Sequence, residues 1–179
     1  MSRASVVIVA ATAAIVAACA DSGIVEPSAA PHKTTAARTS SVGPSRPAGG
    51  TCTFASTLLP PEQGQPPNVV RFSVAEVCHL QHLGLTTAAA LEVATFTAGG
   101  AVATFTTTYT AANGDQLFTT SSVTATLPDP SGVIYFSGTE TVAGGTGRFA
   151  DASGSFSVSG SVSVVTSTGQ IQLSGTLSY

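Results

Sequence analysis

The sequence contains no tryptophan and few charged side chains. Of its 179 residues only 8% are charged, and beyond Gly50 the only lysine or arginine residues are Arg71 and Arg148. A protein that binds nucleic acid needs clustered basic side chains, so this composition excludes nucleic acid as a partner. Alanine and valine supply the apolar excess, and glycine, serine and threonine are abundant. Such a composition is typical of a β-rich extracellular protein.

The short motifs of common enzyme classes are also missing. The sequence has neither the G-x-S-x-G motif of serine hydrolases nor the H-E-x-x-H motif of zinc proteases. His79 and His82 have the spacing H-x-x-H, but on a strand they would point to opposite faces of the sheet. We therefore predict no catalytic residues, no metal site and no cofactor.

The amino-terminal residues indicate an export signal. Residues 6–18 form an apolar run that is too short to span a bilayer. The run ends in Val16-Ala17-Ala18-Cys19, which resembles the bacterial lipobox, whose cysteine receives diacylglycerol. We expect residues 1–18 to be a lipoprotein signal peptide and Cys19 to anchor an extracytoplasmic protein to a bacterial membrane. The alternative is plain secretion, because Ala18-Cys19-Ala20 also satisfies the A-x-A cleavage rule.

Residues 19–50 are expected to form a tether. Four prolines lie among alanine, serine and threonine residues, and apolar residues recur with neither a helical nor a strand period. Such a segment cannot offset the entropy lost on ordering, so it should be disordered. The folded domain is then predicted to cover residues 51–179.

Two cysteines remain once Cys19 is assigned to lipid. An even pair in an oxidising compartment favours a disulfide, so Cys52 and Cys78 are predicted to be linked. The alternative is a pair of buried free thiols.

From Thr51 onward, apolar and polar residues alternate with a period of two. The alternation is clearest in residues 155–164 and 170–178, and it indicates strands with one face on a core and the other on water. Asn113-Gly114 predicts a two-residue hairpin turn, Thr168-Gly169 predicts another turn, and residues 128–132 predict a longer loop. Together these segments predict an all-β domain of six to eight antiparallel strands in a sandwich or a closed barrel.

One stretch of the domain is ambiguous. Residues 86–94, TTAAALEVA, include several helix-forming residues. Residues 93–97 nevertheless continue directly into a β pattern. We therefore predict a strand here, with a helix as the alternative.

The segment from Gly145 to Ala150 matches G-x-G-x-x-A, a variant of the dinucleotide-binding fingerprint. That fingerprint needs a helix after the glycines and an acidic residue about twenty positions later. Here the glycines precede an alternating segment, and no acidic residue follows Asp151. The sequence therefore predicts turn glycines with positive φ between two strands.

The same segment carries a family resemblance. It matches the signature G-G-T-G-x-F and is similar to the allene oxide cyclase barrel superfamily, which includes the plant dirigent proteins and many bacterial secreted proteins. The likeness is best over residues 133–179. It implies an up-and-down antiparallel β-barrel of eight strands whose lumen can hold an apolar small molecule, and it carries over no activity. The matching residues are Gly144, Gly145, Thr146, Gly147 and Phe149.

Two carboxyl groups share the phase of the apolar residues around them. Glu76 and Glu140 would therefore point into the core, where an unpaired charge is costly and a carboxyl group has a raised pKa. We treat Glu76, Glu140, Arg71 and Arg148 as candidate polar groups of the lumen, in which the arginines could pair with the carboxyl groups. The alternative is a position at a barrel mouth or in an ordinary ion pair.

Two functions of different classes fit these features. The first is a lipid-anchored barrel without catalysis that binds a small apolar ligand or another surface component. The alternative is a small isomerase or cyclase that steers a reactive intermediate in the lumen. Convergent polar groups in an open cavity would favour the enzyme, whereas a lumen filled by apolar side chains would favour a structural or binding role.

Overall fold

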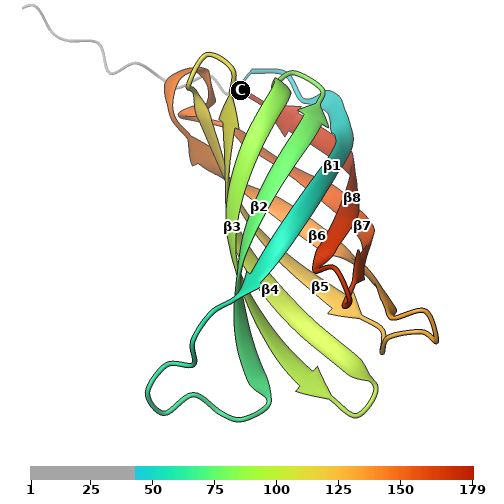
Figure 1. Cartoon of the computed structure of the whole chain (residues 1–179). Coiled ribbons are helices and arrows are strands. Elements are labelled where there is room, and N and C mark those ends of the chain that lie inside the picture. The colour runs from blue at the N-terminus through green and yellow to red at the C-terminus, as the bar shows by residue number, and fades with distance from the viewer. Residues whose placement is uncertain (1–42) are drawn as a thin grey trace, which may run out of the picture. The chain divides into compact units, whose positions relative to one another are not determined.

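The computed structural model describes residues 43–179, which form a closed antiparallel β-barrel (Figure 1). Each strand pairs with its neighbours in sequence, and β1 pairs with β8 to close the ring, so the predicted fold class is confirmed. No helix within residues 43–179 is long and apolar enough to cross a membrane. The strands are β1 (Arg46–Leu58), β2 (Val69–Leu80), β3 (Gly84–Thr97), β4 (Gly100–Ala111), β5 (Gln116–Ala125), β6 (Val133–Gly145), β7 (Ser153–Ser163) and β8 (Thr168–Ser178).

The alternation in the sequence becomes an inward and an outward face of the barrel. In β2, Val74, Glu76, Cys78 and Leu80 are buried while the residues between them are exposed. The ambiguous segment, residues 86–94, lies wholly within β3, which confirms the strand prediction. The threonine and serine residues that separate the apolar ones mostly face outward, as expected for a sheet with one face in water.

The first strand begins earlier than the sequence predicts. Residues 46–50 belong to β1 rather than to the tether, although Pro47 and the Gly49-Gly50 pair have the composition of a linker. The pairing of β1 with β2 starts only at Gly50, opposite Leu80. Pro47 therefore lies beyond the ladder of β1 and β2. The N–H group that proline lacks removes no hydrogen bond from that ladder.

Two turn predictions also need adjustment. The turn between β7 and β8 is formed by residues 164–167, and Thr168 and Gly169 belong to β8. Glycine is required at position 169 on steric grounds, because an added Cβ would lie 2.5 Å from Cζ of Phe54. The turn between β4 and β5 contains Asn113 and Gly114 as predicted, but it spans residues 112–115 rather than two residues.

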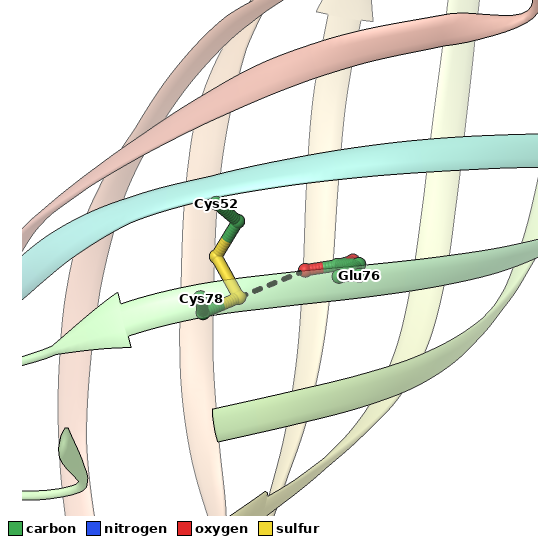
Figure 2. Close-up of side chains that lie close together, drawn as sticks. All are labelled: Cys52, Glu76 and Cys78. Atoms are coloured by element: carbon green, nitrogen blue, oxygen red, sulfur yellow. Dashed lines mark hydrogen bonds between the residues drawn. A yellow bond between two sulfur atoms is a disulfide. The ribbon is translucent and has the colours of Figure 1, made fainter. Parts of the chain in front are cut away.

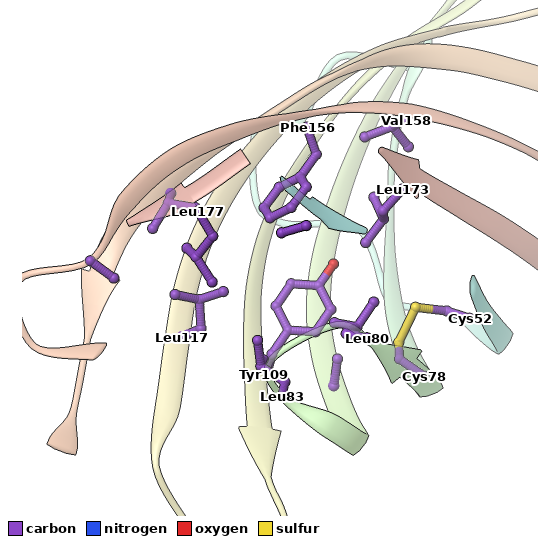
Figure 3. Close-up of a cluster of buried hydrophobic side chains, with 14 of the residues drawn as sticks. Cys52, Cys78, Leu80, Leu83, Tyr109, Leu117, Phe156, Val158, Leu173 and Leu177 are labelled. Atoms are coloured by element: carbon purple, nitrogen blue, oxygen red, sulfur yellow. A yellow bond between two sulfur atoms is a disulfide. The ribbon is translucent and has the colours of Figure 1, made fainter. Parts of the chain in front are cut away.

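The two ends of the barrel differ in their packing. We call the end with turns 81–83, 112–115 and 146–152 the closed end, because large apolar side chains fill the barrel there (Figure 3). The opposite end carries the loops 59–68 and 126–132, and we call it the open end. The side chains that pack the closed end include Leu80, Leu83, Leu117, Phe149 and Leu177.

The glycine-rich segment helps to seal the closed end. A one-turn 3-10 helix, η1 (Gly147–Phe149), follows β6 and inserts the Phe149 ring, which is 0% exposed, into the core. Gly147 has φ +56°, and a Cβ there would lie 1.9 Å from Oδ1 of Asp115. The backbone N–H of Gln116 donates a hydrogen bond to Oγ1 of Thr146 (2.9 Å). These contacts, and the strand β7 that follows, show that residues 146–152 form a turn in which Gly147 has positive φ, as predicted. Gly145 instead belongs to the end of β6 and has no positive φ.

Candidate functional site

A cavity of about 390 Å³ occupies the lumen and extends to the open end. Its volume is near the lower limit of small-molecule sites, roughly 300–1,000 Å³. The wall is mainly apolar and contains several aromatic rings, while its polar side chains include three carboxyl groups. The aromatic residues of the wall are Phe54, Phe72, Phe96, Phe105, Tyr109 and Phe136, and the acidic ones are Glu76, Glu92 and Glu140.

Glu76 and Glu140 come from opposite walls of the barrel. Glu76 is on β2 and Glu140 on β6, which lie four strands apart in the ring of eight. Both side chains point into the lumen and are almost fully buried, with 5% and 4% of their surface exposed. Tyr109, on β4 between these walls, also lines the cavity.

Burial raises the pKa of the Glu76 carboxyl to about 7, and the nearby charge of Glu140 adds to the rise. Glu76 Oε2 lies 3.6 Å from Sγ of Cys78 (Figure 2). That sulfur is bonded to Cys52 and carries no hydrogen, so only the protonated carboxyl can donate a hydrogen bond across this gap. The contact therefore agrees with a carboxyl group that is partly protonated near neutral pH.

Glu140 is buried beside two hydroxyl groups but keeps one unpartnered oxygen among the described residues. Burial raises its pKa, and the neighbouring hydroxyl groups of Thr119 and Tyr109 partly offset the rise. Even so, neither Glu140 Oε1 nor Thr119 Oγ1 has a partner at hydrogen-bonding geometry among residues 43–179. Burial also raises the pKa of Tyr109 well above its ordinary value, so this phenol remains a hydrogen-bond donor. An orphaned buried acceptor of this kind calls for a partner.

Glu92 is a third acid of the lumen, which the sequence interpretation missed. It lies on β3 opposite Phe72 of β2 and Phe105 of β4, and burial raises its pKa to about 7. The available signal was its phase, since Ala88, Ala90 and Ala94 at the same parity are buried. Alanine occupies both parities of this stretch, so the inward face was hard to identify from composition.

The predicted cations do not enter the lumen. Arg71 has the opposite phase from Phe72 and forms an ion pair with Glu62 in the loop between β1 and β2. Arg148 belongs to η1 at the closed end, where Nε lies 3.7 Å from Asp115 Oδ2. The prediction that either arginine lies in the lumen is therefore wrong. No lysine, arginine or histidine lines the cavity in the part of the chain that the structure describes.

The predicted disulfide between Cys52 and Cys78 is present and buried. The two residues are direct partners in the ladder of β1 and β2, with Cα atoms 4.0 Å apart. Cys52, Cys78 and Glu76 are close enough to share a metal ion. Both sulfurs are engaged in the disulfide, however, so this cluster offers thiolate ligands only after reduction.

Chemically, the site combines an apolar chamber with three carboxyl groups, two of them with a pKa of about 7. Such groups can donate or accept a proton near neutral pH, and they can fix the polar end of a ligand. The lipidation predicted for Cys19 and the signal peptide and tether predicted before residue 43 lie outside the described residues. No family model matches the sequence, and comparisons with curated proteins and with solved structures found no match.

Proposed function

We propose that this protein is a lipid-anchored, extracytoplasmic β-barrel that binds a small apolar ligand in its lumen. The observation that carries the proposal is the cavity of about 390 Å³, whose wall is mainly aromatic and aliphatic. The interior of an eight-stranded barrel is just wide enough either to be filled by side chains or to hold one small ligand. Here the closed end is filled and the open end is hollow, which supports a binding role.

Native mass spectrometry of the full chain tests this binding role. We expect an added mass from a co-purified small molecule, or from decanol added to the purified chain. The variant Ala103→Phe places a ring in the cavity and should abolish the added mass, because Ala103 is buried in its wall. Thr104→Phe is the matched control, since Thr104 is the next residue of β4 and is exposed. Wild-type chain that binds neither molecule would contradict the proposal.

The second candidate function is a small isomerase or cyclase. The convergence of Glu76, Glu140 and Tyr109 on an open cavity favours it, because a carboxyl group with a pKa of about 7 is suited to general acid and base catalysis. The resemblance to the allene oxide cyclase barrel superfamily supports the same reading. Conversion of a bound ligand that is lost in Glu76→Gln, with ligand binding retained, would establish the enzyme in place of a simple carrier.

The membrane anchor has its own test. Labelled palmitate should be incorporated into the wild-type chain in a bacterial host and should be absent from Cys19→Ala, because the lipid attaches to that cysteine. Unlabelled wild-type protein whose mature chain starts at Asp21 would instead establish plain secretion.

A further inference from the structure

Among the described residues, acidic side chains line the lumen and basic ones do not. Glu76, Glu92 and Glu140 all line the cavity, and no basic side chain does so within residues 43–179. The three arginines within residues 43–179 are held elsewhere: Arg71 by Glu62, Arg148 by Asp115, and Arg46 over the Tyr179 ring. In their ionised form the carboxyl groups of the lumen repel an anionic ligand such as a fatty acid. They favour a ligand that brings a positive charge of its own.

A second observation points to a missing donor. The Thr119 and Tyr109 hydroxyl groups lie beside the Glu140 carboxyl group, but its Oε1 atom is buried without a hydrogen-bond partner in the described part of the chain, although the group lines an accessible cavity. Buried acceptors are almost always satisfied by protein, water or ligand. A protonated amine supplies up to three N–H donors, which suits a chamber with carboxyl groups on the opposite strands β2 and β6.

Aromatic rings lie next to two of these carboxyl groups. In the strand ladders Glu76 is paired with Phe54, and Glu92 is paired with Phe72 and Phe105. All three rings line the cavity. The face of an aromatic ring attracts a cation, so the surroundings of the carboxyl groups also favour an ammonium group. The remaining wall is aliphatic and suits a hydrocarbon tail.

We propose that the lumen binds an apolar amine, with its protonated amino group between Glu76 and Glu140 and its hydrocarbon tail along the aromatic and aliphatic wall. This assignment rests on the proposed binding function and names the chemical class of its ligand. An ammonium group would pair with one of these carboxyl groups in its ionised form, while the other stays protonated, and it would give Glu140 Oε1 a donor. The buried charges would then be paired, which is the condition for burying them at moderate cost.

Three ligands with the same tail test the proposal. Decylamine, decanol and decanoate are measured by displacement of the neutral fluorescent probe N-phenyl-1-naphthylamine from the full chain near neutral pH. We expect decylamine to bind at least about tenfold more tightly than decanol, a difference of ~1.4 kcal/mol, and decanoate to bind most weakly. Binding of decanol and decylamine with equal affinity would overturn the amine assignment while leaving the apolar binding site intact.

Variants test which carboxyl groups cause the preference for decylamine over decanol. Glu140→Gln and Glu76→Gln should each lower the affinity for decylamine more than the affinity for decanol, so that the preference for decylamine falls. Glu62→Gln is the matched control, because Glu62 is acidic and close to the open end but does not line the cavity. A preference that survives in the double variant of Glu76 and Glu140 would also overturn the assignment. Failure of every ligand and of the probe to bind would instead contradict the binding function itself.

Discussion

Glu76 shows how the fold changes the chemistry of a single residue. Its side chain is surrounded by apolar groups and a disulfide, so the carboxyl group has lost the water that would stabilise its charge. Its pKa rises from the ordinary value of 4.5 to about 7 as a result. A group of this kind is retained at a cost to stability, which is typical of residues that serve binding or catalysis.

The cost of Glu76 should appear as a dependence of stability on pH. The folded state binds the proton more tightly than the unfolded state, so the free energy of unfolding falls as the pH rises from about 4.5 through 7. Glu76→Gln removes this loss. We expect the variant to be more stable than wild type by up to about 3 kcal/mol at pH ~8 and to be similar to it at pH ~4.5. Urea denaturation across this range measures the difference, and a difference that does not change with pH would contradict the burial argument.

Gly147 is a second residue whose identity the fold dictates. Gly147→Ala would place a Cβ at φ +56° and against the Asp115 carboxylate, displacing the partner of Arg148. Gly114→Ala is the matched control, because φ there is +86° but no atom lies within 4 Å of the added Cβ. We expect both to be destabilised by about 1–2 kcal/mol for the left-handed backbone, with Gly147→Ala losing more. Equal melting temperatures would show that the contact with Asp115 does not constrain the turn.

At the scale of elements, the disulfide joins β1 to β2 at the wall that carries Glu76. Cys52 and Cys78 are 26 residues apart in sequence, and a crosslink over a loop of this length stabilises a fold by about 3.5 kcal/mol through the unfolded state. The double variant Cys52→Ser, Cys78→Ser should lose about this amount in denaturant unfolding. Peptide mapping without reductant should recover the linked pair. Free thiols at both positions in oxidised protein would contradict the bond.

The elements also show what could be predicted from sequence. Alternation between small polar and apolar residues was sufficient to predict the strands and to place Glu76 and Glu140 on the inward face. The alternation did not identify Glu92 as an inward residue, because alanine occupies both faces of that strand. Composition also placed Gly169 in a turn, whereas glycine is needed there for close packing against Phe54. Which walls face each other follows from the closure of the ring, which no local pattern encodes.

At the scale of the whole molecule, the barrel divides its interior between two tasks. The closed end is a packed core sealed by Phe149 and by the turns around it, and it supplies stability. The open end leaves its interior hollow and carries its acids on facing walls. Packing the whole lumen would have stabilised the fold further, so the hollow half is the part of the structure that needs a functional explanation.

Titration of the full chain with N-phenyl-1-naphthylamine tests most directly whether the hollow half binds a ligand. We expect fluorescence enhancement that saturates at one probe per chain in wild type and in Thr104→Phe. The enhancement should be absent from Ala103→Phe, whose added ring occupies the cavity, and the melting temperature of each variant confirms that it is folded. Saturable binding that is unchanged in folded Ala103→Phe, or no binding by wild type, would contradict a ligand site in the lumen.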